Sequence, residues 1–244
     1  MKIAINLTRD AVGGITSSNL NLVNYLYKID YEFVGLELVS LMYMKGPVLF
    51  RHFDPEVFDH HIINIHHLPL MDVLRRSRTL KDAEEAYEKP VKIIRRILKE
   101  TNPDAVLLSG TYYLPWLISI AAKKEGIPIV LWYSGVLSKE TEHYPNKLKG
   151  LFLAMEKSVV NNATRIIFPS DLCKETVEDL VVKSKIKNSY VIPNPVAGIF
   201  TDPSAVDASI ERRIAAVGRY SRIKNFDKFF ELHLELQKRK WRHT

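Results

Sequence analysis

Residues 102–133 read NPDAVLLSGTYYLPWLISIAAKKEGIPIVLWY, and this stretch decides the fold. Ala105 to Leu108 is a compact apolar run of the kind that forms a buried strand. The next residues predict a helix through Leu117 to Lys124 that ends at Gly126, and Ile127 to Tyr133 predicts a second strand. Strand, helix and strand in this order make up one crossover unit, whose two strands run parallel.

The same alternation of apolar strands and helices runs along most of the chain. Further strands are predicted at Ile3 to Leu7, Phe33 to Leu41, His61 to Leu68, Arg165 to Phe168 and Tyr190 to Ile192, and further helices at Ile15 to Ile29, Val73 to Glu100 (broken near Pro90), Leu148 to Val160 and Leu172 to Val182. Strands of this kind form parallel sheets that helices cover on both faces. The sequence therefore predicts an α/β fold with a doubly wound, mostly parallel sheet, in which ligands bind beyond the carboxyl ends of the strands.

The character of the sequence changes after the last of these strands. Thr201 to Ser209 is polar and rich in turn-forming residues, as linkers are. The strand-and-helix pattern restarts with Arg213 to Gly218 and with a helix from Phe226 to about Lys240. One strand and one helix cannot bury a core of their own. We therefore predict a first domain over residues 1–198, and over residues 199–244 a linker with the first units of an incomplete second domain.

The composition limits the classes of partner and of site. The 244 residues hold 35 lysines and arginines against 28 aspartates and glutamates, and this net charge of +7 favours anionic partners. Cys173 is the single cysteine, which excludes an internal disulfide and a multi-cysteine metal site. The first residues lack the longer apolar core of a signal peptide, and no apolar run approaches the roughly 20 residues that cross a bilayer. We therefore expect a cytoplasmic protein.

A glycine pair, Gly13 and Gly14, stands between the first predicted strand and the first predicted helix. Glycine lets the backbone approach a phosphate or a sugar closely, and the amides that begin a helix favour anions. The pair is not the G-x-G-x-x-G fingerprint of dinucleotide sites, so nicotinamide binding is not predicted. Either a ligand-binding loop or a plain tight turn fits these two residues.

Three short segments, in this order, carry a resemblance to a known family. The first is the loop with Gly13 and Gly14. The second, Ile192 to Val196, is similar to an I-P-N-G-V closing strand, with Pro195 in the place of glycine. The third, Val217 to Asp227, contains the runs V-G-R-Y and K-N-F-D. Together they resemble the retaining glycosyltransferases of the GT-B fold, in the large group that includes sucrose, mannosyl and glycogen synthase-like enzymes.

The resemblance implies a reaction as well as a fold. The first domain would be the Rossmann-like, acceptor-side domain, and the tail would open the donor-side domain. The reaction would be transfer of a sugar, with retention, from a nucleotide-sugar donor to a sugar or lipid-linked acceptor. The nucleotide sugar is a substrate, and neither a cofactor nor a metal is implied. Arg219 and Lys224 would neutralise the diphosphate, with Gly13 and Gly14 also on the donor side.

The resemblance is incomplete in two places. The family's acidic Glu…Glu motif, which holds the donor sugar and the ribose, has no counterpart in these residues, so we expect the chain alone to be inactive. The family also often has a histidine after the strand that corresponds to Ile129 to Tyr133, where this chain has the run W-Y-S-G. The candidate catalytic or acceptor-contacting residues in its place are Ser134, Glu140 and His143.

Residues 90–99 predict a basic amphipathic helix. Its charged face is either solvated, as on most such helices, or in contact with an anionic membrane at the inner face of the cell membrane. The candidate membrane-surface residues are Lys92, Arg95, Arg96 and Lys99.

Other interpretations stay open beside the enzyme. The chain would also suit a non-catalytic acceptor-binding module, or a basic nucleic-acid-binding protein, although no nucleic-acid motif is present. The tail helix carries an apolar face that favours docking on the first domain or pairing with a second copy in a homodimer. The residues of this face are Phe226, Phe229, Phe230 and Leu234.

Overall fold

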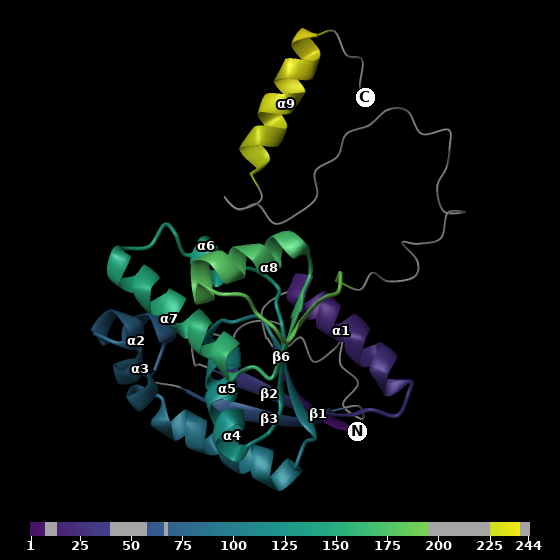
Figure 1. Ribbon diagram of the computed structural model, residues 1–244, viewed down its shortest axis with the longest axis vertical. Coiled ribbons are helices and arrows are strands. Elements are labelled where there is room, and N and C mark those ends of the chain that lie inside the picture. Colours follow the sequence, from purple (N-terminus) through teal and green to yellow (C-terminus); the bar gives the residue numbers. More distant parts are fainter. Residues whose placement is uncertain (8–13, 40–57, 66–67, 195–224, 240–244) are drawn as a thin grey trace. The chain divides into compact units, whose positions relative to one another are not determined.

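The structure, a computed structural model, describes residues 1–7, 14–39, 58–65, 68–194 and 225–239. The chain separates into two compact units, Met1–Val196 and Ala197–Thr244. The first unit is an α/β domain with a central sheet between helices (Figure 1).

The strands that the structure describes in the first unit form one parallel sheet. They are β1 (Lys2–Leu7), β2 (Glu32–Val39), β3 (Phe58–Asn64), β4 (Ala105–Ser109), β5 (Ile129–Trp132), β6 (Arg165–Phe168) and β7 (Ser189–Val191). Their order is β3-β2-β1-β4-β5-β6-β7, and each neighbouring pair is parallel. The chain therefore starts in the middle of the sheet, builds outward to β3 and then crosses to the other side of β1. This order confirms the predicted doubly wound sheet.

Helices cover both faces of the sheet, with α1 on one face and α4, α5 and α7 on the other (Figure 1). The helices of the first unit are α1 (Gly14–Tyr27), α2 (Leu70–Arg76), α3 (Leu80–Ala86), α4 (Glu88–Thr101), α5 (Tyr113–Glu125), α6 (Leu137–Glu140), α7 (Asn146–Asn162) and α8 (Asp171–Val177), which a π-helical turn continues over Glu178–Val182. This cover explains why the strands are apolar on both sides rather than on alternate residues only.

Successive residues of each central strand enter two different cores. In β1, Ala4 belongs to the larger core under α2 to α8, while Ile3 and Ile5 belong to the smaller core under α1. In β4, Leu108 faces the larger core and Leu107 the smaller one. Full burial of an aliphatic side chain contributes about 1.5–3 kcal/mol, so the two cores hold the sheet from both sides.

Two helix boundaries differ from the sequence prediction for local reasons. Helix α5 begins at Tyr113 rather than at Leu117, because Pro115 lies in the first turn, where a missing amide donor costs nothing. The charged stretch that we predict as helical from Val73 is split before α3, where Thr79 and Asp82 form a capping box. A capping box satisfies the free amides of a new helix, so it starts α3 instead of continuing α2.

The second unit is described through α9 (Phe226–Lys238) alone. Its apolar residues Phe230, Leu232 and Leu234 are 46–56% exposed. The strand that we predict at Arg213 to Gly218 lies outside the described residues, so the pairing of this tail stays a prediction.

Candidate functional site

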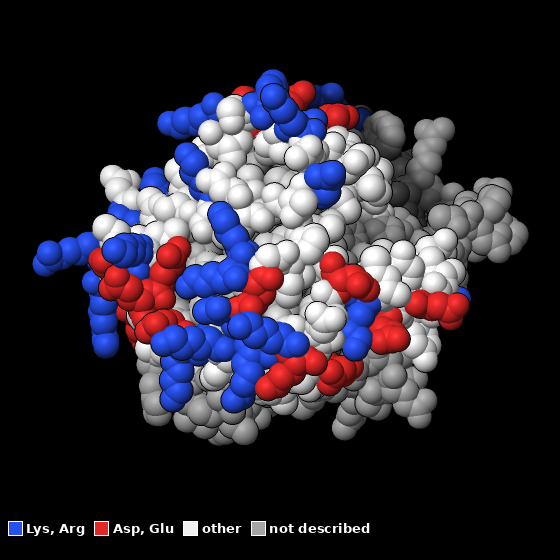
Figure 2. All heavy atoms as spheres, turned by 60° about the horizontal axis from the view of Figure 1, so that its bottom comes forward, with Lys and Arg blue, Asp and Glu red and all other residues white. Residues whose placement is uncertain are grey.

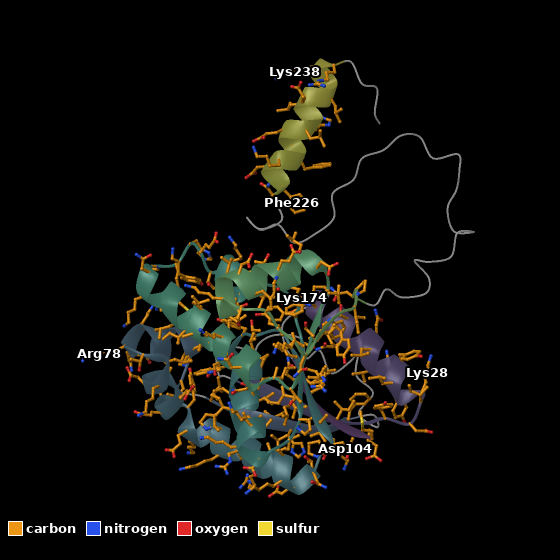
Figure 3. The ribbon with its side chains drawn as sticks, in the orientation of Figure 1. Lys28, Arg78, Asp104, Lys174, Phe226 and Lys238 are labelled. Atoms are coloured by element: carbon orange, nitrogen blue, oxygen red, sulfur yellow. The ribbon has the colours of Figure 1, made fainter. Side chains whose placement is uncertain are left out.

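The order of the strands reverses between β1 and β4, and open α/β sheets bind ligands beside such a point at the carboxyl ends of the strands. The two ends of the sheet are easily told apart. Asp104, just before β4, marks the amino ends, and Lys174, in the helix after β6, lies on the opposite side (Figure 3). The candidate site is therefore built from the residues that follow β1, β4 and β5.

A buried polar network fixes the reversal point. Asn6 at the end of β1 donates from Nδ2 to the Ser109 carbonyl (3.3 Å) and accepts the Ser109 amide at Oδ1 (2.7 Å). The Ser109 hydroxyl in turn donates to Oδ1 of Asn19 in α1 (2.5 Å). All three side chains are buried, where a hydrogen bond is costly to break. The network therefore holds α1, which begins at Gly14, in a fixed position against β1 and β4.

The loops after β4 and β5 meet at Gly110. Its amide donates to the Trp132 carbonyl (2.9 Å), and its φ of +82° lies in the left-handed region that favours glycine. A Cβ atom at this position would lie 2.9 Å from Oγ of Ser134, which is closer than real side chains come. The positive φ therefore favours glycine here, and the short distance shows that the candidate Ser134 lies against the end of β4.

The remaining candidate residues follow Ser134 along the same loop. The Glu140 carboxylate folds over Gly135 so closely that a Cβ atom on this glycine would overlap Oε1. His143 is exposed, and its ring packs on Tyr144 with centroids 4.3 Å apart. The structure therefore brings Ser134 and Glu140 into one neighbourhood, with His143 three residues further along.

Glu156 also belongs to the site. Sequence reasoning missed the part that this residue plays in holding the loop after β5. It lies in α7 with no exposed surface, and its carboxylate accepts three hydrogen bonds from the segment after β5. Oε1 accepts the Tyr133 hydroxyl (2.8 Å) and the Leu137 amide (2.9 Å), and Oε2 accepts the Ser138 amide (2.8 Å). The side chain thereby caps α6 and closes the loop that carries Ser134.

A signal for this role is present in the sequence. Glu156 falls on the apolar stripe of α7, four residues after Phe152 and three before Val159. A charged residue almost never occupies such a position unless it has partners. The partners themselves are up to 23 residues away, so only the tertiary structure reveals them.

The electrostatics around Glu156 exclude two nearby groups as reactive acids or nucleophiles. Burial, with the neighbouring Glu156 charge, holds the pKa of the Tyr133 phenol well above its usual range. Burial, and to a smaller extent the same charge, raises the pKa of the Cys173 thiol to about 11. Because the thiolate is the nucleophile, the protonated Cys173 is inert at neutral pH, and both groups act in packing and hydrogen bonding.

The sequence profile described as Glycosyltransferase Family 4 matches residues 12–197. The chain belongs to glycosyltransferase family 4. Its fold is accordingly half of a GT-B enzyme, and the resemblance drawn from the three sequence segments is confirmed. No curated protein matches the chain.

Solved structures agree with this fold. UDP-GlcNAc 2-epimerase from Neisseria meningitidis, bound to UDP-GlcNAc, has a TM-score of 0.52 at 16% identity, over 80% of this chain and 46% of that chain. UGT2 of Phytolacca americana, complexed with UDP-2fluoro-glucose and pterostilbene, has a TM-score of 0.50 at 12% identity, over 79% of this chain and 53% of that chain. The family 4 chain thus spans about half the length of these proteins.

The basic helix of this family 4 domain is α4, and its four candidate membrane-surface residues lie in ion pairs. Their partners are Glu88 for Lys92 (2.8 Å), Glu100 for Arg96 (3.8 Å), and Glu125 for both Arg95 and Lys99 (3.3 Å to Lys99). Figure 2 shows lysines and arginines interspersed with aspartates and glutamates on the face that lies at the bottom of Figure 1. Much of the charge is therefore compensated, and the predicted contact with an anionic membrane stays a prediction.

Several candidates of the sequence analysis cannot be placed. Gly13, Arg219 and Lys224 lie outside the described residues, so the donor-side assignments stay predictions. Within the described ranges, no group of histidine, cysteine, aspartate and glutamate side chains is suited to a metal ion. Among the helices that the structure describes, none has the length and apolar character of a membrane span.

Proposed function

We propose that this chain forms the acceptor-side half of a retaining glycosyltransferase, which transfers a sugar from a nucleotide-sugar donor to an acceptor. The observation that carries the proposal is the family 4 match over residues 12–197. The solved structures support it only as far as the fold, because the same architecture occurs in proteins named as epimerases. The family match therefore favours transfer over epimerisation.

In this proposal each group of residues has a separate task. Gly13 and Gly14 let the substrate approach the start of α1, whose position the buried network around Asn6 fixes. Ser134 and Glu140 contact the acceptor from the loop after β5, which Glu156 holds in shape. Preorganised positions of this kind lower the entropy that a transfer reaction must lose.

The leaving group is a nucleoside diphosphate, and its departure needs positive charge. Arg219 and Lys224 would supply that charge, since guanidinium and ammonium groups stabilise phosphate oxygens without a metal. Both residues belong to the unit Ala197–Thr244.

A fusion tests the proposal. The chain is joined after Val196 to the donor-side domain of a characterised family 4 enzyme and incubated with labelled nucleotide sugars and a panel of acceptors. We expect transfer with retained anomeric configuration, seen by NMR of the product, which Glu140→Gln reduces and the matched Glu85→Gln in α3 does not. Products of inverted configuration, or an epimerised donor sugar without transfer, would contradict the proposal.

We also propose that α4 contacts an anionic membrane. The chain should sediment with anionic vesicles at low salt and be released as salt rises, because screening weakens such contacts. Replacement of Arg95 and Arg96 by glutamate should abolish this sedimentation. Equal binding to neutral vesicles, or no binding, would leave α4 as an ordinary solvated helix.

A further inference from the structure

A row of aromatic rings lies beside the loops that carry Ser134. Tyr112 stacks on Phe152 with centroids 6.1 Å apart and planes at 25°. Tyr144 packs on the same Phe152 ring (5.5 Å), and His143 packs on Tyr144 (4.3 Å). We call these four rings the aromatic row. They come from three different parts of the chain, so the row is a feature of the fold and not of a local segment.

The row has a rigid base and an open surface. Phe152 in α7 is 1% exposed and contacts the rings of both Tyr112 and Tyr144. Tyr112 is 47% exposed and His143 is exposed, while Tyr144 is half-buried. Tyr112 therefore presents part of its ring to solvent beside the buried Phe152.

The two consecutive tyrosines show that the outward position is specific. Tyr113 points inward, where its hydroxyl donates to the Leu68 carbonyl (3.0 Å) beside the Tyr87 ring. Tyr112 precedes α5 with an extended backbone, and its side chain makes no capping hydrogen bond. Its side chain is therefore not needed to start the helix, and its ring is placed on Phe152 instead.

The row lies at the carboxyl edge of the sheet, on the acceptor side of the proposed site. Tyr112 is two residues after Gly110, where an added Cβ atom would lie 2.9 Å from Oγ of Ser134. Near the row in sequence, Lys139 pairs with Glu142 (2.9 Å), whereas Lys147 donates to the neutral Arg75 carbonyl (2.6 Å) and keeps its charge. The exposed ring surface itself is apolar and suits a ligand with an apolar face.

From this placement we propose that the aromatic row is the acceptor subsite and that the acceptor presents a neutral pyranose ring to Tyr112. The C–H groups on one face of a pyranose carry a small positive charge and stack on the negative face of an aromatic ring. Tyrosine hydroxyls and imidazole nitrogens can donate and accept hydrogen bonds, which the sugar hydroxyls need. The inference rests on the proposed function, and it assigns the substrate class of the same site.

Binding of saccharides to the full chain tests the inference without any donor. The probes are methyl pyranosides and short neutral oligosaccharides, followed by saturation-transfer NMR and by titration of the protein amide signals. Saturation should reach the C–H protons of one ring face most strongly. The Tyr112→Ala variant should bind about 2- to 10-fold more weakly, the fold-change that corresponds to one aromatic stack, while Tyr112→Phe should bind nearly as the parent chain does.

Two controls make the outcome decisive. Tyr25→Ala removes a tyrosine that is 65% exposed on α1, on the opposite face of the sheet, and should leave binding unchanged. If Tyr112→Ala fails to fold, Tyr144→Leu tests the row at its second tyrosine. Absence of saccharide binding, equal binding by Tyr112→Ala, or Tyr112-dependent binding of planar phenols alone would overturn the inference. None of these results depends on transfer, so the proposed function is judged separately by the fusion.

Discussion

Substitution of Glu156 by glutamine tests how the loop after β5 is held. Glutamine has the shape of glutamate, and its carbonyl oxygen can still accept the Tyr133 hydroxyl and the Leu137 amide. Its NH₂ group then faces the Ser138 amide, so the third hydrogen bond is lost between two donors. A hydrogen bond to a charged group contributes about 1.5–3 kcal/mol. For a domain of this size that loss lowers the melting temperature by roughly 3–12 °C.

The same substitution has a second readout at the single cysteine. Burial is the larger cause of the raised pKa of Cys173, and the Glu156 charge is the smaller one. Removal of that charge should therefore lower the pKa of the thiol from about 11, although not to the value of an exposed cysteine. The pH dependence of alkylation by iodoacetamide, at a temperature well below unfolding, reports this pKa because the thiolate is the reactive form.

The matched control is Glu85→Gln in α3, where the carboxylate is 70% exposed and pairs with Lys81 at 4.0 Å. Exposed pairs of this kind contribute little, so both the melting temperature and the alkylation profile should stay as they are in the parent chain. An unchanged melting temperature together with an unchanged alkylation profile in Glu156→Gln would refute the capping role.

Three further predictions concern stability. Gly110→Ala should lower the free energy of unfolding by about 1–2 kcal/mol, because a left-handed residue with a Cβ atom is strained. Gly150→Ala, in α7 where a Cβ atom meets no neighbour, should raise the free energy of unfolding by about 0.5–1 kcal/mol. Urea unfolding of both variants tests these two values. Hydrogen bonds from the Ile186 amide and then from Lys185 lower the pKa of the buried Glu178 below 4.5. The stabilisation is thus complete well above pH 4.5 and lost as the pH falls through the folded pKa, so Glu178→Gln should be less stable than the parent chain at pH 7, and this difference should shrink as the pH falls below 4.5. Deletion of the residues after Pro195 should leave a folded domain that is monomeric in light scattering. The prediction is wrong if the full chain is strictly monomeric and the shortened chain does not fold.

The sequence was a good guide wherever a local pattern decides the structure. Residues 102–133 predict the strand, helix and strand that become β4, α5 and β5, because apolar runs and helical periodicity are properties of neighbouring residues. The α/β class and the parallel sheet follow from repetition of that unit. Boundaries were less accurate where a single side chain decides them, as Thr79 does in starting α3.

The candidate site was predicted less completely. The choice of Ser134 and Glu140 rested on the family's usual histidine position, and the structure brings the two residues together at Gly135 without testing their roles. Glu156 and the aromatic row escaped notice because their contacts join segments that are distant in the sequence. Periodicity cannot reveal which residues of two separate helices meet.

The reversal of strand order has a consequence for how the domain assembles. Asn6 and Ser109 are separated by 103 residues, so their hydrogen bonds form only after a long loop has closed, and the entropy of that closure is lost before the contacts can offset it. Parallel pairings of such high sequence separation are the slow steps of folding. During synthesis on the ribosome, β1 can pair with β4 only after more than a hundred residues have been made. Until then the edge of β1 that later pairs with β4 is unpaired, and an unpaired edge can pair with other chains.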